Sequence, residues 1–350
     1  MAACMKNPVV ATTLVRLLDA NEGFALGGRG TTNHCPMALC ALAAMGASSG
    51  RLEEFFDQWQ RRFGIAASSK RFEVKPASWP DFKDDPGAFH SLRDFFKKWI
   101  LQSNADAVLN EVLRRIPFAP ATGAFHAVIR LAYGLDANHS GEIAAGLAAL
   151  ITENLQVAPP VGDLAAAASI ENALHRLSAG LQNKMFPRRT SITATLQAIA
   201  IDPAFQALLQ RPPATPALLD LLAEVAIAQY WHKADFTTLH MVTGMDAIRR
   251  VGARLPAEML HALHDGAWGA FCTAYVAIGT PCISAAQSCV ASIPADEFSV
   301  PPWSELLARA ITSDDDHVIK MTYTSWRLGK PEIQPIYRLA AARLIGMDSA

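Results

Sequence analysis

A polar stretch near the C-terminus combines residues that can bind a metal or transfer protons. Ser313 is followed three residues later by Asp316, which is the spacing of a helix-capping box, and acidic residues fill the first turn. This pattern predicts a helix over 314–327 with His317 and Lys320 on one face, three positions apart. Histidine is the most common metal ligand in proteins, so this face is a candidate metal-binding face. A solvated polar face is the alternative interpretation.

Three further histidines lie near or within apolar faces of predicted helices in distant parts of the chain. His34 stands at the start of a helix of small residues, and His240 lies in the middle of an apolar stripe. His126, Arg130 and Tyr133 share one face at positions i, i+4 and i+7. A single buried histidine is more often a core residue than a ligand. Several histidines from separate helices can instead meet in a core, which is how helical bundles build metal sites.

The helical pattern that would position these residues extends along the chain. The predicted helices include residues 12–20, 88–102, 104–116, 122–134, 141–155, 216–231, 236–251, 256–278, 281–291, 302–312, 314–327 and 335–345. No long alternating run predicts a sheet, and no fixed-period repeat is present. We therefore predict an all-α fold, a single domain over 1–350 built as a bundle-like array of helices around a buried metal and substrate site. The proline-containing connection 64–86 is expected to be irregular, for example a lid over a pocket.

Composition and charge exclude several classes of protein. The 350 residues are 51% hydrophobic and 18% charged, which is enough apolar sequence for a large core and too much for a disordered chain. The net charge of −1, with acids and bases mixed, gives no nucleic-acid footprint. The six cysteines form no C-x-x-C pair and are expected to be reduced.

Membrane, secretory and dinucleotide signals are also lacking in the sequence. Lys6 and Pro8 interrupt any apolar signal segment, and the uncharged run 266–295 is broken by Gly279-Thr280-Pro281. The glycines of 27–30 do not follow a strand and have the wrong spacing for a flavin or nicotinamide fingerprint. These features predict a soluble, cytoplasmic protein with no bound flavin.

Four short motifs, in order along nearly the whole chain, resemble those of the questin oxidase-like family. They are Asn33-His34 leading to Gly46-Ala47-Ser48, Gly123–His126 with Leu131–Tyr133, Leu239–Thr243, and Asp316–Lys320. The resemblance implies oxygen-dependent oxidation of polycyclic aromatic polyketides such as anthraquinones, by Baeyer–Villiger-type or ring-cleaving steps. The sequence resembles the shorter, bacterial-type members, and Arg130 stands where fungal members tend to have a second histidine.

Oxidation by O₂ needs a flavin or a redox metal, because spin-paired carbon reacts slowly with triplet oxygen. We therefore predict Fe(II) as the cofactor; zinc fits the same ligands but does no redox chemistry. The predicted ligands are His34, His126, His240 and His317, with Lys320 as a fifth. Lys320 would compensate the metal charge as a carbamate, whereas a plain ammonium would repel the ion. The predicted substrate-binding residues are Arg130, Tyr133 and Thr243.

Two other classes of function remain open at the level of sequence. One is an NADPH-dependent Baeyer–Villiger-type monooxygenase without bound flavin, which would use the same site. The other is a non-catalytic helical protein whose histidines are structural or bind a ligand. The expected partners are a small hydrophobic aromatic substrate and O₂, with no nucleic acid and no membrane.

Overall fold

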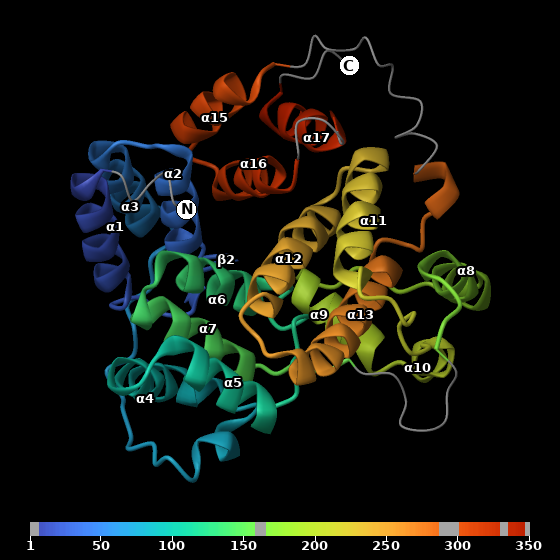
Figure 1. Cartoon of the computed structure of the whole chain (residues 1–350), viewed down its shortest axis with the longest axis horizontal. Coiled ribbons are helices and arrows are strands. Elements are labelled where there is room, and N and C mark those ends of the chain that lie inside the picture. Colours follow the sequence, from blue (N-terminus) through green and yellow to red (C-terminus); the bar gives the residue numbers. More distant parts are fainter. Residues whose placement is uncertain (1–6, 158–165, 287–300, 330–334, 347–350) are drawn as a thin grey trace.

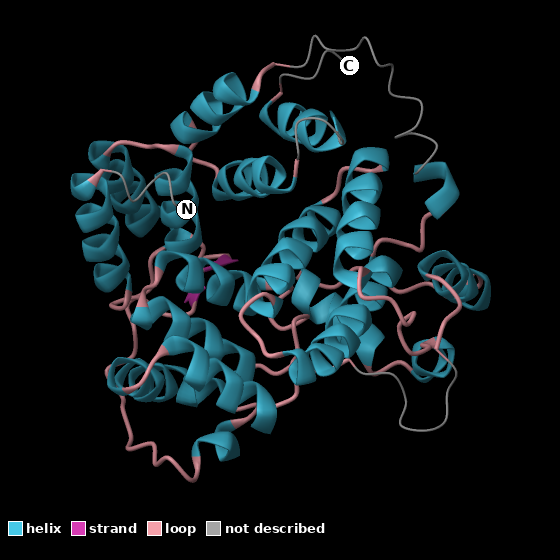
Figure 2. Ribbon diagram, viewed as in Figure 1, coloured by secondary structure: helices cyan, strands magenta, loops and turns pink. Residues whose placement is uncertain are grey.

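The computed structural model is dominated by helices (Figure 1). It describes residues 7–157, 166–286, 301–329 and 335–346. Among these residues the only sheet is the antiparallel pair of two-residue strands β1 (Gly27–Gly28) and β2 (Thr31–Thr32), drawn in magenta in Figure 2. The predicted all-α fold is confirmed. None of the described helices has the length and apolar character needed to cross a membrane.

The helices follow one another through short connections for most of the chain. In order they are α1 (Pro8–Asn21), α2 (Cys35–Met45), α3 (Ser49–Phe63), α4 (Phe89–Gln102), α5 (Ala105–Arg115), α6 (His126–Ala137), α7 (Ser140–Thr152), α8 (Ile170–Leu181), α9 (Ile192–Ala200), α10 (Pro203–Leu208), α11 (Leu218–His232), α12 (Phe236–Gly252), α13 (Leu260–Ala277), α15 (Trp303–Thr312), α16 (Asp316–Leu328) and α17 (Pro335–Ile345). Short 3-10 helices are η2 (Trp79–Phe82), η3 (Pro86–Ala88) and η4 (Ala257–Met259). The predicted helix 281–291 extends beyond the described residues.

The boundaries of α6 differ from the prediction at both ends. The helix starts at His126 rather than after Thr122, because Gly123 and Phe125 have positive φ values of 57° and 71° and break the helical path. At the other end, Gly134 does not stop the helix. Its missing side chain lets α7 approach, since a Cβ atom there would lie 2.7 Å from the backbone nitrogen of Ile143.

One cluster of buried apolar residues runs from Val10 in α1 to Ala340 in α17. Helix α2 belongs to this cluster, and all of its residues are buried. A continuous core of this kind is typical of a single domain. That one domain spans residues 1–350 stays a prediction. The helices of the core approach closely where small residues face one another. For example, a Cβ atom on Gly146 of α7 would lie 2.6 Å from the Cα atom of Leu131 in α6.

We expect Gly146→Ala to lower the free energy of unfolding by about 1–3 kcal/mol, because the added methyl group must push two helix backbones apart. Gly50→Ala in α3 is the matched control, since the nearest atom to its Cβ position is the Ser48 Oγ atom at 4.0 Å. Gly50→Ala should leave the free energy of unfolding unchanged or raise it slightly. Urea unfolding of both variants makes the comparison, and equal stabilities would contradict the tight α6–α7 contact.

Four helices of the core form a ring through their contacts. Helix α2 packs on α6 and α16, and α12 packs on the same two helices. Each carries one of the predicted histidine ligands at or near its N-terminal end. His34 is the residue before α2, His126 and His317 lie in the first turns of α6 and α16, and His240 is the fifth residue of α12. The fold thus brings four helix N-termini together.

Candidate metal centre

The imidazole rings of the four predicted histidines form a closed cycle. Ring centroids are 4.5 Å apart for His34 and His126 and 4.8 Å apart for His126 and His240. His317 closes the cycle, 4.8 Å from His34 and 5.5 Å from His240. The Nε2 atom of His126 is 2.7 Å from that of His34 and 3.1 Å from that of His240. Residues from distant parts of the sequence therefore meet at one point.

The second nitrogen of each ring faces an oxygen that can only accept a hydrogen bond. Nδ1 of His240 lies 2.6 Å from the carbonyl oxygen of Phe236, and Nδ1 of His126 bonds the carbonyl oxygen of Gly123. Nδ1 of His34 lies 2.7 Å from the Oδ1 atom of Asp316. In a neutral imidazole only one nitrogen carries a proton, so these contacts put the proton on Nδ1. The Nε2 lone pairs are then left to face one another.

This arrangement fits a metal ion. Two lone pairs 2.7 Å or 3.1 Å apart repel in a dry interior unless a cation lies between them. Nitrogen ligands with bonds of about 2.0–2.1 Å to one ion are about 3 Å apart, as these atoms are. The Nε2 atom of His317 is also buried, with no hydrogen-bond partner among the described residues. Ligand histidines typically donate the other ring N–H to a carboxylate or backbone carbonyl, as these rings do.

The buried histidines are in the protonation state that a ligand needs. Burial, reinforced by the nearby Lys320, lowers the pKa of His34 to about 4. Burial likewise holds the pKa values of His126 and His240 well below the ordinary value. These three rings are therefore neutral at pH 7, and each offers a lone pair.

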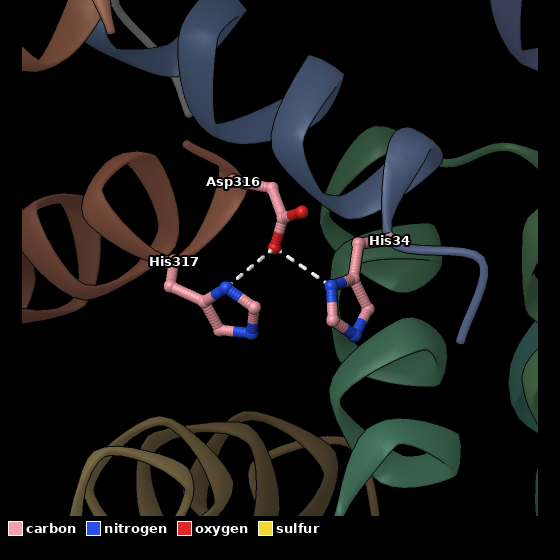
Figure 3. Close-up of side chains that lie close together, drawn as sticks. All are labelled: His34, Asp316 and His317. Carbon is pink, nitrogen blue, oxygen red and sulfur yellow. Dashed lines mark hydrogen bonds and ion pairs between the residues drawn. The ribbon is translucent and has the colours of Figure 1, made fainter. Parts of the chain in front are cut away.

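Asp316 is the member of the cluster that sequence reasoning missed. Its carboxylate lies between His34 and His317, with Oδ1 2.7 Å and 3.2 Å from their Nδ1 atoms, and the second nitrogen of each ring lies away from it (Figure 3). Burial by itself would raise the pKa of Asp316, but Lys320 and the histidines hold it well below its ordinary value. The sequence assigned Asp316 to a capping box, whereas the cap is Asp315, which accepts from the His317 backbone amide.

Lys320 is buried in the same cluster. Its side chain is 3% exposed, which rules out a solvated position, and Nζ lies 3.2 Å from the Oδ1 atom of Asp316. Burial lowers the pKa of Lys320, and Asp316 opposes that shift. The amine thus has a carboxylate partner, and its role as a fifth ligand stays a prediction. Asp316 and Lys320 are four residues apart on one helix face, a spacing that is also common for surface pairs.

A pocket of about 390 Å³ opens beside the rings. His34, His126 and His240 form part of its wall, next to the aromatic ring of Phe236. The rest of the wall comes from Gly30–Thr32, residues 188–193, Thr195, Ala124, Thr237 and Ala277. The connection 64–86, expected as a lid, contributes no residue to this wall, whereas residues 188–193 and Thr195 do. The pocket is within the range of known small-molecule sites.

The structure does not bring the three predicted substrate-binding residues to this pocket. Arg130 forms a buried ion pair with Glu142, with nitrogen–oxygen distances of 2.6 Å and 3.0 Å. Tyr133 is buried in the core, and the Thr243 hydroxyl donates to the carbonyl oxygen of Leu239. None of the three lines the pocket beside the histidines. Their role in binding a substrate stays a prediction.

The sequence matches the questin oxidase-like family over residues 31–233 and 216–325, which together are most of the chain. The chain belongs to the questin oxidase-like family. It is therefore an oxygenase, a class of oxidoreductase, and the family implies O₂ and an aromatic polyketide-type compound as its substrates. This membership favours an enzyme over the non-catalytic alternative. No curated protein matches the chain.

Proposed function

We propose that the protein is a non-haem iron-dependent oxygenase of a polycyclic aromatic or quinone-type substrate, acting by carbon–carbon cleavage or Baeyer–Villiger-type oxygen insertion. The observation that supports this proposal is the convergence of imidazoles whose Nδ1 atoms are all matched to acceptors. His34, His126, His240 and His317 would hold the ion through Nε2. Bound iron supplies the one-electron chemistry that lets triplet O₂ react with a spin-paired ring.

Asp316 has two tasks in this proposal. It accepts from Nδ1 of His34, and its Oδ1 atom lies 3.2 Å from Nδ1 of His317, so it is placed to orient both rings. It also supplies negative charge where four helix N-termini, each carrying a partial positive charge, surround the site. A cation at this place would be disfavoured without such an anion.

Phe236 is suited to cover the site on the side of the pocket. Its ring centroid lies 4.8 Å from that of His240 and 4.4 Å from that of His317, while about half of the side chain (53%) is exposed. It can therefore keep water from the histidines on one side and offer a flat apolar surface to an aromatic substrate on the other.

Lys320→Met tests the ligand role of Lys320. If Lys320 is a ligand as its carbamate, the variant should lose iron by about 10-fold or more, and wild-type protein labelled with ¹³C-bicarbonate should show a carbamate carbon by NMR. If Lys320 is instead an ammonium that pairs with Asp316, removal of a cation near the metal should leave iron content equal or higher. Full iron content in Lys320→Met would therefore contradict the carbamate proposal and leave the four histidines as the ligand set.

The reaction itself is tested with untagged protein loaded anaerobically with Fe(II). We expect O₂ uptake with a hydroxylated anthraquinone, and a product that mass spectrometry shows to contain oxygen from ¹⁸O₂. Uptake that requires NADPH would favour the monooxygenase alternative, and uptake without it would favour ring cleavage by a dioxygenase. Equal uptake by metal-free protein would contradict the proposed iron dependence.

A further inference from the structure

The pocket beside the histidines is polar and basic rather than simply apolar. Hydroxyl side chains provide much of its wall: Thr31, Thr32, Thr190, Ser191, Thr193, Thr195 and Thr237. Two arginines, Arg188 and Arg189, line the same pocket as the histidines. Among the described residues that line the pocket, none is an aspartate or glutamate. Such a wall favours a ligand that carries negative charge.

The two arginines differ in whether a carboxylate lies near the guanidinium group. A guanidinium nitrogen of Arg188 lies 2.7 Å from Oδ2 of Asp235, the residue that caps α12. The guanidinium of Arg189 has no carboxylate of the described residues within 4.0 Å. Its backbone amide donates to the Thr195 hydroxyl at 3.0 Å, which ties this part of the segment to α9. Within the described part of the chain, Arg189 is therefore the cation of the pocket wall that lacks a carboxylate partner.

Helix N-termini add to the positive electrostatic potential that Arg189 produces in the pocket. Ser191 caps α9, and the residues of its first turn, Ile192 and Thr193, line the pocket. The N-terminal ends of α6 and α12 reach the same pocket through His126 and Thr237. Each helix N-terminus carries a partial positive charge, so the potential of these ends and that of Arg189 have the same sign.

We propose that the substrate is an aromatic oxyanion, a ring system with a carboxylate or an ionised phenol, and that Arg189 binds its acidic group. With the oxyanion on Arg189, the ring system can lie against Phe236 beside the histidines that form the same wall. This inference rests on the proposed function in taking the pocket as the substrate site. Arg189 is assigned here as a specificity-determining residue that contacts the substrate.

The test is isothermal titration calorimetry of the purified full-length protein under anaerobic conditions, so that no turnover occurs. The probes are anthraquinone-2-carboxylate, its neutral carboxamide and 2-hydroxyanthraquinone. We expect wild-type protein to bind the carboxylate about 10-fold more tightly than the carboxamide, a modest value because Arg189 is exposed. Arg189→Gln should remove this preference and leave the carboxamide affinity within about 2-fold, while Arg189→Lys should keep part of it.

Arg211→Gln is the matched control, because Arg211 is also exposed but does not line the pocket. It should keep the wild-type preference. Tighter binding of ionised 2-hydroxyanthraquinone than of the carboxamide would identify a phenolate as the acidic group. If only the carboxylate binds more tightly than the carboxamide, the acidic group is a carboxylic acid. Wild-type protein without either preference, or Arg189→Gln with an unchanged one, would overturn the proposal. These affinities require neither iron nor O₂, so failure of the oxygenase assay would be seen separately.

Discussion

His240→Ala is expected to lower both the iron content of the protein and its O₂ consumption by at least about 100-fold. His240 is 1% exposed, and its Nδ1 atom lies against the carbonyl oxygen of Phe236, which directs Nε2 toward the other rings. Loss of residues that only orient ligands typically costs about 10–100-fold in metal affinity, and loss of a ligand should cost at least as much. Iron is measured by mass spectrometry of anaerobically loaded protein, and O₂ with an electrode.

His175→Ala is the control for this change. His175 is exposed on α8 and contributes nothing to the pocket wall, so its removal should leave iron content and turnover unchanged. Circular dichroism shows whether either variant has lost its helices. A folded His240→Ala protein with full iron content would mean that this ring is only a core residue.

Asp316→Asn is expected to weaken Fe(II) binding by about 10–100-fold with little change in the fold. The amide has the shape of the carboxylate but no charge, and its NH₂ group would face ring N–H groups or the Lys320 amine. His34 and His317 would lose the acceptor that orients them, and the surrounding helix N-termini would lose their counter-charge.

Anaerobic titration with Fe(II) measures the dissociation constants, and Asp314→Asn serves as the control. Asp314 is 46% exposed and pairs with Arg51, so its carboxylate is not part of the histidine cluster. If Asp316→Asn and Asp314→Asn bind iron equally well, Asp316 has no part in supporting the metal.

Helices with local signals could be predicted from the sequence. The predicted helices 104–116 and 236–251 correspond to α5 and α12, which begin at the capping residues Asn104 and Asp235, and α17 has the predicted bounds Pro335–Ile345. The start of α6 could not be predicted, because residues in left-handed conformations precede it and only Gly123 among them favours that conformation. The predicted helix 122–134 ends at Gly134, whereas α6 continues to Ala137 and this glycine is a contact point with α7.

The histidines could be singled out because imidazoles on apolar faces are unusual and because each lies in a motif that resembles the family. Asp316 could not be singled out, because an acidic residue at a helix start is explained by capping alone. Its contact with His34 depends on the packing of α16 on α2. Arg130 shares a helix with His126, but the partner that decides its role, Glu142, comes from α7. The segment that carries Arg189 has no periodicity that would connect it with any histidine.

The most direct test of the central claim is the metal content of untagged protein, loaded with Fe(II) under anaerobic conditions and freed of excess metal by gel filtration. X-ray absorption of the same sample gives the ligands of the bound ion. The four-histidine site predicts one iron per chain with a first shell dominated by imidazole nitrogens at about 2.0–2.2 Å. A sample that retains no more iron than His240→Ala, or an ion whose first shell lacks imidazole, would contradict it.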